Sequence, residues 1–459
     1  MFINRSDELA FLNSKWDQRG GQLIILWGKR RVGKTELVKR FIQDKPALYF
    51  AAEMTSRRDQ ISQFSVLCAE FYKDPLLASR GFGSWDEVFL YLGQKKERLV
   101  LAIDEFPYLL DADSAVASIF QNGLDEHLRA TSIFVLLLGS SIGMMEREVL
   151  GQRSPLYGRR TGQWKVEPMS FRHVRRFRPD ASFNDQISHY ALAGGMPAYW
   201  LQFEDKLDFW QNVVQHVLAK GQYLYDEAEF ILRQELREPR HYFAILSAIS
   251  QGKRKLSEIV NATGFPPTLI NKYLGILADL HIVERELPAT ENKPHKAKNG
   301  LYQIQDAFLH FWFRFVFPRR SLIEMGQVQL LAAGIRREWP VYMGGVYEQV
   351  CAELLTAAGA DFFPFLRVGR WWNRTEEIDL VATNEEANRI LFAEAKFTGK
   401  PVGTNIYDDL RRKSKLVVWG APGRREQFSL FSAAGFTDAM LRLAETEGVA
   451  LWEGEERVI

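Results

Sequence analysis

The segment from Gly28 to Thr35 constrains the fold of this chain more than any other. It reads Gly-Lys-Arg-Arg-Val-Gly-Lys-Thr, which has the G-x-x-x-x-G-K-[ST] spacing. An apolar run at 23–27 precedes it and an amphipathic helical pattern at 36–42 follows it. A strand, a glycine loop and a helix start form a phosphate cradle, because main-chain N–H groups and the helix N-terminus present positive potential to an anion. The sequence therefore predicts a nucleotide site here.

The spacing assigns a role to each key residue of this loop. Gly28 and Gly33 let the backbone turn tightly and approach the phosphates. Lys34 would reach the β- and γ-phosphates, and the Thr35 hydroxyl would hold Mg²⁺. The alternative, a chance match in an ordinary glycine turn, does not account for the flanking strand and helix. We assign these residues to nucleotide binding: Gly28, Arg31, Val32, Gly33, Lys34, Thr35 and Glu36.

An acidic pair follows the apolar run at 98–103. Asp104 would bind Mg²⁺ through water and complete the site begun by Thr35, and Glu105 would polarise a water against the γ-phosphate. The alternative is a solvated acidic pair at a strand end. Ser140 or Ser141, after the apolar run at 133–138, could read the γ-phosphate or form an ordinary turn. We predict Mg²⁺ ligation by Thr35 and Asp104, with Glu105 as the hydrolytic residue.

Four apolar runs, at 23–27, 47–51, 98–103 and 133–138, alternate with helical patterns. This alternation is typical of a parallel sheet with helices on both faces. The 459 residues suggest about three domains. A net charge of +2 does not indicate a nucleic-acid partner, so any basic surface must be local.

Cysteine usage and hydropathy bear on the compartment. Cys68 and Cys351 have no metal-ligand spacing and suggest no disulfide scaffold, as is typical of a reducing cytoplasm. The N-terminus has no apolar signal core, and no apolar run approaches the roughly 18 residues of a spanning helix. We therefore expect a cytoplasmic protein without a membrane partner.

Further segments carry a family resemblance, in the family's order. Phe2-x-x-Arg5-x-x-Glu8-Leu9, the segment at 154–162 and Gly194-Gly195-Met196-Pro197 resemble motifs of the archaeal-type ATPases, which belong to the STAND branch of the AAA-like P-loop NTPases. The resemblance implies that Arg5 lies near the adenine and that Pro197, in a helical lid, packs on the base. Asn4 stands where the family has glycine.

The resemblance also implies an arginine that contacts the γ-phosphate in cis or in trans. Arg153, Arg159 and Arg160 are the candidates, and surface or inter-domain ion pairs are the alternative role for each.

Three helical patterns, at 241–249, 256–261 and 268–280, precede two short strands at 282–285 and 301–304, which is a winged-helix order. Thr268, Asn271 and Lys272 on the third helix could enter a DNA groove. The wing would carry four basic residues: Lys293, His295, Lys296 and Lys298. The alternative is a packing and regulatory module, because the other faces of the third helix are apolar. The aromatic helix at 308–317 is expected in a core.

The C-terminal part contains an E…D…ExK pattern formed by Glu348, Asp379, Glu394 and Lys396. Strand alternation places Glu394 and Lys396 on one face, with Asp379 on the adjoining hairpin strand. Asp379 and Glu394 could then share Mg²⁺, and Lys396 could orient or deprotonate the attacking water. The pattern resembles the PD-(D/E)xK nuclease superfamily and the uncharacterised C-terminal domain of many archaeal-type ATPases. The alternative is a nuclease-like fold that binds DNA or a partner without cleaving it.

An arginine- and tryptophan-rich segment, 369–374, precedes the aspartate strand. It could grip a nucleic-acid backbone and stack a base, or form a packed aromatic bend.

These readings combine into an α/β multidomain protein. We predict a P-loop ATPase domain at 1–165, a helical lid at 166–235, a winged helix at 236–318 and a restriction-endonuclease-like α/β domain at 319–459. The predicted function is an Mg-ATP-driven switch or motor coupled to a DNA-binding C-terminal domain, and the sequence leaves open whether that domain also cleaves DNA. The alternatives are a nucleotide-gated, non-cleaving scaffold and a chaperone-like ATPase acting on protein. The partners would be ATP or ADP and DNA, and both a homo-oligomeric ring and a monomer are compatible.

Overall fold

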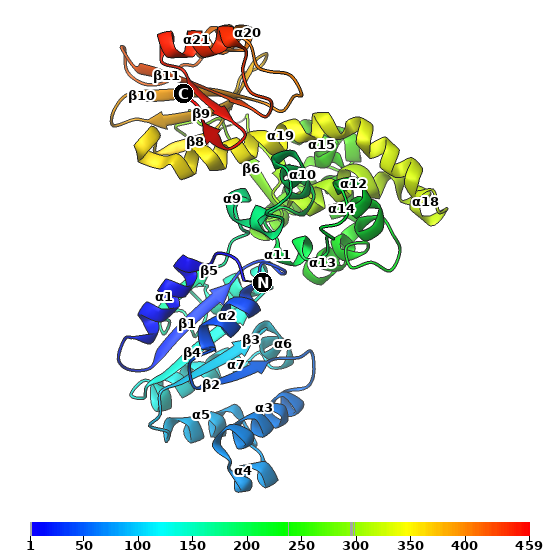
Figure 1. Cartoon of the computed structure of the whole chain (residues 1–459). Helices are drawn as coiled ribbons and strands as arrows, with labels where there is room; N and C mark the ends of the chain where they lie inside the picture. Colours follow the sequence, from blue (N-terminus) through cyan, green and yellow to red (C-terminus); the bar gives the residue numbers. More distant parts are fainter. Residues whose placement is uncertain (1, 237, 294–296, 298) are drawn as a thin grey trace. The chain divides into compact units, whose positions relative to one another are not determined.

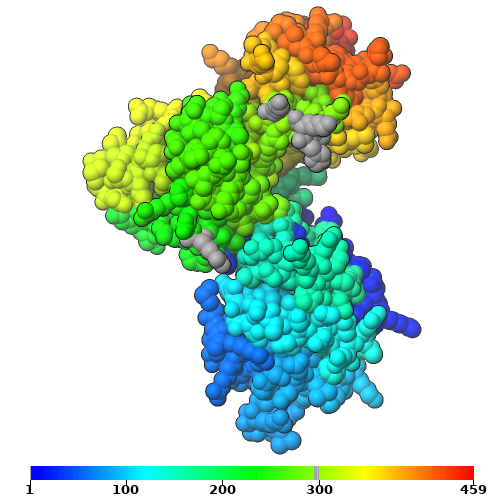
Figure 2. Space-filling model, turned by 180° about the vertical axis from the view of Figure 1, so that it is seen from behind, coloured from blue at the N-terminus to red at the C-terminus, as the bar shows by residue number. Residues whose placement is uncertain are grey.

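The computed structural model describes residues 2–236, 238–293, 297 and 299–459, and it consists of two compact units. Unit 1 runs to Met169 and also includes Gly195–Tyr199, whereas unit 2 comprises Ser170–Gly194 and Trp200–Ile459. Figure 1 labels the elements of each unit, and Figure 2 shows the chain from behind, with unit 1 in blue to cyan. No helix within the described ranges is both long and apolar enough to cross a membrane.

Unit 1 is built on a five-stranded sheet in which every pairing is parallel, with strand order β2-β3-β4-β1-β5. β1, β3 and β4 are buried along their whole length, because helices cover both faces and the strand residues are apolar on both. The predicted parallel α/β sheet is confirmed. The strands are β1 (Gln22–Trp27), β2 (Ala47–Ala51), β3 (Leu99–Asp104), β4 (Ile133–Gly139) and β5 (Gly162–Lys165).

The edge strand β5 was not predicted, since its sequence Gly-Gln-Trp-Lys contains no apolar run. It pairs with β1 at the edge of the sheet, and none of its residues is fully buried. Its sequence therefore lacks the run of apolar residues that marks a buried strand.

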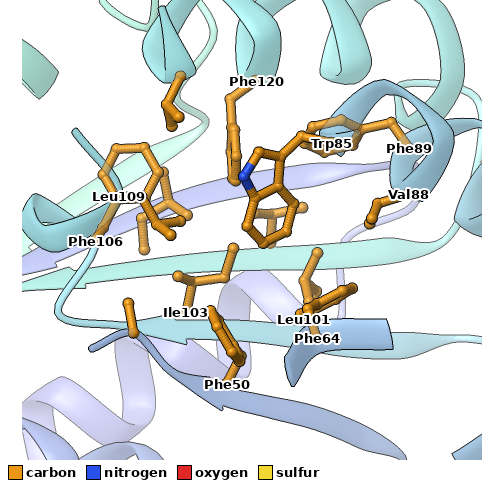
Figure 3. Close-up of a cluster of buried hydrophobic side chains, with 14 of the residues drawn as sticks. Phe50, Phe64, Trp85, Val88, Phe89, Leu101, Ile103, Phe106, Leu109 and Phe120 are labelled. Atoms are coloured by element: carbon orange, nitrogen blue, oxygen red, sulfur yellow. The ribbon is translucent and has the colours of Figure 1, made fainter. Parts of the chain in front are cut away.

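Large aromatic side chains fill the space between the sheet and one helical layer (Figure 3). Trp85, Phe89, Phe106 and Phe120 are each at most 1% exposed, and burying such a side chain contributes about 1.5–3 kcal/mol. On the other face, the ring of Phe41 lies 5.5 Å from that of Phe134. This packing fixes the carboxyl ends of the strands. The helices of unit 1 are α1 (Ser6–Trp16), α2 (Lys34–Ile42), α3 (Arg57–Tyr72), α4 (Pro75–Arg80), α5 (Trp85–Gly93), α6 (Pro107–Ala112), α7 (Val116–Gly123) and α8 (Ile142–Met144).

Unit 2 begins with short helices: α9 (Phe171–Val174), α10 (Phe183–Ala193), α12 (Phe209–Asn212) and α13 (Glu227–Glu235). Three further helices and an antiparallel hairpin follow in the predicted order: α14 (Pro239–Ser250), α15 (Leu256–Thr263), α16 (Pro267–Asp279), β6 (Val283–Glu286) and β7 (Leu301–Ile304). His295, Lys296 and Lys298 of the predicted wing lie outside the described residues. The aromatic segment forms α17 (Ala307–Phe311) and a π-helical turn (Trp312–Val316), and it is buried as predicted.

A long helix, α19 (Val328–Phe362), leads into a separate mixed sheet of order β13-β12-β11-β10-β9-β8. β8, β9 and β10 pair antiparallel, whereas β10, β11 and β12 pair parallel. The predicted separate C-terminal α/β region is therefore present. Its elements are β8 (Arg367–Trp372), β9 (Glu377–Asn384), β10 (Arg389–Lys396), α20 (Thr404–Ser414), β11 (Arg425–Ser432), α21 (Asp438–Glu447), β12 (Ala450–Glu453) and β13 (Glu456–Arg457).

Within unit 2, polar contacts fasten α9 and α10 to α19. The Glu353 carboxylate accepts hydrogen bonds from the Tyr190 hydroxyl at 2.5 Å and from the Phe171 N–H at 2.8 Å. The Tyr342 hydroxyl donates to the Ala191 carbonyl at 3.1 Å. These side chains come from sequence-distant elements, so α19 joins the helical region to the C-terminal sheet.

Candidate functional site

The loop between β1 and α2 has the backbone that its glycines predict. Gly28 has φ +151°, and a Cβ there would lie 2.3 Å from the Val166 carbonyl oxygen, so only glycine fits. Arg31 and Gly33 have φ +67° and +96°, which turns the chain through left-handed conformations before the helix. Such a turn directs main-chain N–H groups toward one concave side, as an anion site requires.

Lys34 opens α2 and is 6% exposed. Its ammonium group donates to the carbonyl oxygens of Gly28 and Lys29, both at 2.9 Å, and therefore lies across the loop. Glu36 is exposed and pairs with Lys39 at 3.2 Å, so its carboxylate points along the helix surface. The structure therefore places the Lys34 ammonium group against the loop backbone, and the phosphate-binding role of both stays a prediction.

Asp104 lies at the carboxyl end of β3 and is 5% exposed. Its Oδ2 accepts hydrogen bonds from the Thr35 hydroxyl at 2.7 Å and from the Tyr49 hydroxyl at 2.6 Å. Burial, together with this carboxylate, raises the pKa of Tyr49 far above its usual value, so the phenol remains a donor. The Asp104 carboxylate and the Thr35 hydroxyl lie side by side, and both are oxygen ligands of the kind that Mg²⁺ prefers.

Sequence analysis missed Tyr49. The signal available in the sequence was a tyrosine, whose ring ends in a hydroxyl, within the apolar run at 47–51. That run and the run that ends in Asp104 were both predicted as strands of one parallel sheet.

Glu105 follows in a left-handed conformation, with φ +54°, which costs a non-glycine residue about 1–2 kcal/mol. The Ser140 hydroxyl, at the end of neighbouring β4, lies 2.6 and 2.8 Å from the two Glu105 carboxylate oxygens. Arg30 Nη1, from the loop, lies 3.8 Å from Glu105 Oε1. The structure therefore brings the predicted acidic pair, the serine strand and the glycine loop to one edge of the sheet.

Arg5 is 4% exposed and contacts the loop from behind. Its Nη2 donates to the Val32 carbonyl at 2.7 Å, while Nη1 donates to the Glu167 carbonyl and to the Glu8 carboxylate, both at 2.9 Å. Asn4 has φ +58°, a conformation that asparagine adopts more readily than most residues. The N-terminal motif is thus pinned to the glycine loop.

Pro197 approaches the same loop. Its Cγ lies 4.0 Å from the position that a Cβ on Gly33 would take. Gly195 passes so close to Met169 that an added Cβ would lie 2.0 Å from the Met169 carbonyl oxygen. The Gly-Gly-x-Pro segment is therefore held against the nucleotide loop by contacts that require glycine.

The three candidate arginines are placed differently. Arg159 pairs with Asp125 at 3.1 Å, and Arg160 donates to the Leu150 carbonyl at 3.1 Å. Arg153 is exposed. Arg159 and Arg160 thus make local contacts within unit 1, and the γ-phosphate role of any of the three stays a prediction.

A second polar cluster lies on the C-terminal sheet. Lys396 Nζ lies 2.5 Å from Glu394 Oε2 and 3.2 Å from Asp379 Oδ2. The Ala395 N–H also donates to Asp379 Oδ2, at 2.9 Å. Lys413, on α20, donates to the other Glu394 oxygen at 2.9 Å. The predicted triad converges, and a second lysine, which sequence analysis missed, completes it.

Burial and neighbouring charge set the protonation of this cluster. Burial, reinforced by the charge of Asp379, raises the pKa of Glu348 to about 7 and also raises the pKa of Glu394. Burial alone would lower the pKa of Lys396, but the two adjacent carboxylates raise it above its usual value. Arg370 Nε lies 3.4 Å from Glu348. The carboxylates of this cluster are thus compensated by cationic side chains.

Two observations bear on the neighbouring predictions. In the part of the chain that the structure describes, no group of three or more His, Cys, Asp or Glu side chains is arranged to hold a metal ion. In the segment at 369–374, Trp371 is 6% exposed within the core, and Trp372 Nε1 donates to the Asn299 carbonyl at 3.1 Å. These contacts favour packing over a base-stacking platform, but residues 369–372 lie on strand β8 and not in a bend.

Comparison with known sequences gives matches along the chain. An ATPase domain found predominantly in Archaea matches residues 2–203, a domain of unknown function matches 184–304, and archaeal and bacterial proteins of unknown function match 312–406. The uncharacterized protein MJECL04 of Methanocaldococcus jannaschii is 36% identical over 422 residues, covering 91% of this chain and 92% of that protein. The uncharacterized ATP-binding protein MJ0423 of the same organism is 56% identical over 45 residues, 10% of this chain and 76% of that protein.

Among solved structures, the Walker-type ATPase PABY2304 of Pyrococcus abyssi is similar, with a TM-score of 0.52 and 22% identity. The match covers 68% of this chain and 96% of that protein. At this level of identity, the likeness is one of fold.

Proposed function

This chain belongs to the archaeal P-loop ATPases that carry a C-terminal domain of unknown function, and on that premise we propose that its ATP hydrolysis drives a conformational switch in a DNA-binding module. The prediction of an ATPase is confirmed by the matched ATPase domain. The observation that carries the proposal is the meeting of Thr35, Asp104 and Glu105 beside the glycine loop.

In the proposed ATP site, the loop N–H groups and Lys34 bind the phosphates. Thr35 and Asp104 would hold Mg²⁺, which would neutralise the charge that develops on the phosphates. Glu105 orients the attacking water and accepts its proton, while Ser140 and Arg30 position the Glu105 carboxylate.

The proposed switch element is the Gly195–Tyr199 segment. It belongs to unit 1, although the residues on both sides of it belong to unit 2. Pro197 lies beside Gly33, and α10 ends at Ala193, directly before the segment. A nucleotide with different affinities for two positions of Pro197 would therefore shift the conformation of the connected helix.

The proposed DNA-reading element is α16. Thr268, Asn271 and Lys272 are exposed, whereas Ile270 and Leu274 are buried. The polar stripe has helical spacing and leaves the apolar face for packing, as a winged-helix recognition helix would require. This exposure supports DNA contact over a purely structural role.

The C-terminal sheet supports a nuclease-like fold. A helix, three antiparallel strands, a second helix and a parallel strand follow in order from α19 to β11, with Asp379 on β9 and with Glu394 and Lys396 on β10. In the cleaving version, Asp379 and Glu394 would hold Mg²⁺, Lys396 would orient the attacking water, and Glu348 would assist. The non-cleaving scaffold is favoured by a specific contact, since Lys396 and Lys413 already neutralise both oxygens of Glu394.

Two assays test these proposals. The first assay measures ATP turnover with and without duplex DNA, and we expect DNA to raise the turnover. Glu105→Gln should lower the turnover by about 10²-fold while ATP binding persists. Turnover that ignores DNA, while a protein substrate stimulates it, would replace the DNA proposal with the chaperone-like one.

For cleavage, single- and double-stranded DNA and RNA would be incubated with Mg²⁺ or Mn²⁺. Cutting that is lost in Asp379→Ala and kept in Lys34→Ala would assign a nuclease to the C-terminal sheet. Binding without cutting would establish the scaffold.

A further inference from the structure

A cavity of about 540 Å³ lies within unit 2, and its lining includes no residue of the glycine loop or of the Asp379 cluster. Its walls come from α9 and the following turn, from α10, from α19, and from the β12–β13 turn. The volume falls in the range of small-molecule sites, roughly 300–1,000 Å³. The lining includes Arg172, Arg175, Arg176, Gln186, Trp452 and Glu455.

The arginines of this cavity form one basic face. Arg172, Arg175 and Arg176 follow the i, i+3, i+4 spacing of one helical surface. Arg175 is paired with Glu455. Arg172 and Arg176 are exposed, and among the described residues no carboxylate pairs with either. Two guanidinium groups are therefore available to an anion, and their forked donors suit phosphate.

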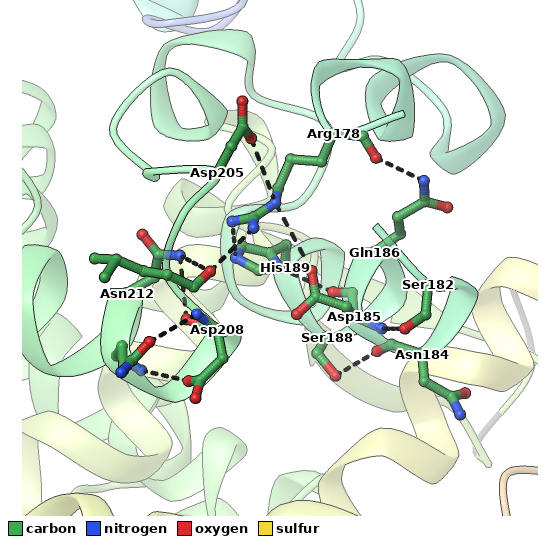
Figure 4. Close-up of polar contacts among 12 residues, drawn as sticks. Arg178, Ser182, Asn184, Asp185, Gln186, Ser188, His189, Asp205, Asp208 and Asn212 are labelled. Atoms are coloured by element: carbon green, nitrogen blue, oxygen red, sulfur yellow. Dashed lines mark hydrogen bonds and ion pairs between the residues drawn. The ribbon is translucent and has the colours of Figure 1, made fainter. Parts of the chain in front are cut away.

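Two other lining residues carry buried polar atoms that lack a hydrogen-bond partner. Gln186 is 1% exposed, and its amide nitrogen donates to the Arg178 carbonyl at 2.7 Å. Figure 4 shows the Gln186 oxygen turned away from that bond, and this oxygen has no donor among the described residues. Trp452 is 7% exposed, and its Nε1–H has no acceptor there either.

Buried polar groups are nearly always hydrogen-bonded, so an unpaired acceptor and an unpaired donor beside a cavity point to a ligand that supplies both. In the same network, Arg178 Nη1 lies 2.9 Å from His189 Nε2, and Arg178 Nη2 donates to the Leu207 carbonyl at 3.1 Å (Figure 4).

We propose that this cavity binds a nucleotide-sized organic phosphate, with its phosphate on Arg172 and Arg176 and its hydrogen-bonding body against Gln186 and Trp452. A nucleobase carries a hydrogen-bond donor beside an acceptor on one edge of its ring. The donor would pair with the Gln186 oxygen and the acceptor with Trp452 Nε1–H. The phosphate matches the two exposed arginines.

The test is isothermal titration calorimetry of the full chain carrying Lys34→Ala, which removes the ammonium group that would bind phosphate at the loop. The probes are uridine monophosphate and inorganic pyrophosphate. Both should bind, and Arg172→Ala with Arg176→Ala should weaken both by about tenfold or more, because charge-assisted hydrogen bonds are lost. Arg442→Ala, which removes an exposed arginine from α21, is the matched control and should change neither.

A second pair of variants separates the phosphate contact from the body contact. Gln186→Met keeps the length of its side chain and Trp452→Phe keeps an aromatic ring, but together they remove the unpaired acceptor and donor, so they should weaken uridine monophosphate binding and leave pyrophosphate binding unchanged. Failure of both probes to bind at millimolar concentration, or equal weakening by Arg442→Ala, would overturn the proposal. So would displacement of uridine monophosphate by a DNA duplex through the same arginines, since that would assign the surface to a nucleic-acid backbone.

Discussion

The ATP site and the C-terminal cluster both place acidic side chains at the edge of a sheet, but they stabilise those carboxylates in opposite ways. Asp104 accepts hydrogen bonds from the neutral hydroxyls of Thr35 and Tyr49. Glu394 instead contacts two ammonium groups, those of Lys396 and Lys413. A cation that arrives at Asp104 displaces neutral donors, whereas one that arrives at Glu394 must compete with fixed positive charge.

The kind of partner, neutral hydroxyl or charged ammonium, distinguishes the ATP site from the E…D…ExK cluster better than the spacing of their residues does. At the glycine loop, Lys34 lies across the loop carbonyls and Thr35 contacts Asp104, whereas Glu36 pairs with Lys39 on the helix surface. In the E…D…ExK pattern, the same kind of spacing yields a charge-compensated cluster, because α20 adds Lys413 and β8 adds Arg370. An acidic motif therefore has to be read together with the cations that its fold places against it.

The largest expected effect tests the ATP side of the comparison. Lys34→Ala removes the ammonium group that bridges the Gly28 and Lys29 carbonyls, and we expect ATP turnover to fall by about 10²–10³-fold. Lys39→Ala removes an exposed lysine from the same helix and should leave turnover unchanged. Turnover is measured by phosphate release, with circular dichroism to confirm folding. Equal turnover in Lys34→Ala and wild type would contradict the assigned site.

The next effect tests the C-terminal side through pH. The pKa of Glu348 is raised from 4.5 to about 7 by burial and by Asp379. A carboxyl whose folded pKa is raised contributes stability that is complete below the unfolded pKa and is lost as pH rises through the folded pKa. Stability should therefore fall between about pH 4.5 and 7, by up to about 3 kcal/mol.

Glu348→Gln keeps the shape of the neutral form, so it should be more stable than wild type at pH 8 and similar to it at pH 4.5. Thermal unfolding at both pH values gives the comparison. Glu445→Gln, on the exposed surface of α21, is the control and should follow wild type. A Glu348→Gln variant with the same pH dependence as wild type would show that another group titrates.

A smaller effect tests whether the lysine partners of Glu394 lower the metal affinity of the C-terminal cluster. Lys413→Met frees one oxygen of Glu394 from its ammonium partner at 2.9 Å. We expect Mn²⁺ affinity in the C-terminal cluster to rise by about tenfold, since one competing charge is gone. Binding is followed by electron paramagnetic resonance in an Asp104→Asn background, which removes the carboxylate that would hold the metal at the ATP site. Lys415→Met, an exposed neighbour on the chain, should have no effect, and unchanged affinity in Lys413→Met would remove the proposed distinction.

The sequence alone predicted features that depend on local order. The glycine loop is contiguous, the buried strands are contiguous apolar runs, and strand alternation placed Glu394 and Lys396 on one face. Each of these needs only neighbouring residues, so spacing is sufficient evidence.

The rest depends on contacts between distant segments. Tyr49 reaches Asp104 because β2 lies beside β3, and Lys413 reaches Glu394 because α20 packs against β10. Sheet order and helix placement set both contacts, and neither leaves a pattern in the neighbouring residues. The same holds for Arg5, whose buried partner is a main-chain carbonyl that carries no side-chain signature.

The smallest effect returns to the neutral donors of the ATP site. Tyr49→Phe removes one of two hydroxyls from Asp104 and keeps the ring, so we expect turnover to fall by about fivefold, the cost of one hydrogen bond of roughly 1 kcal/mol. Because the Tyr49 pKa lies far above its usual value, wild type and variant should differ by the same factor at pH 7 and pH 9. Tyr157→Phe, at an exposed position, controls for loss of a hydroxyl. If the difference in turnover between wild type and Tyr49→Phe grew with pH, Tyr49 would ionise beside Asp104. Asp104 would then not be stabilised by neutral donors alone, and the contrast with the lysine-paired Glu394 would not hold.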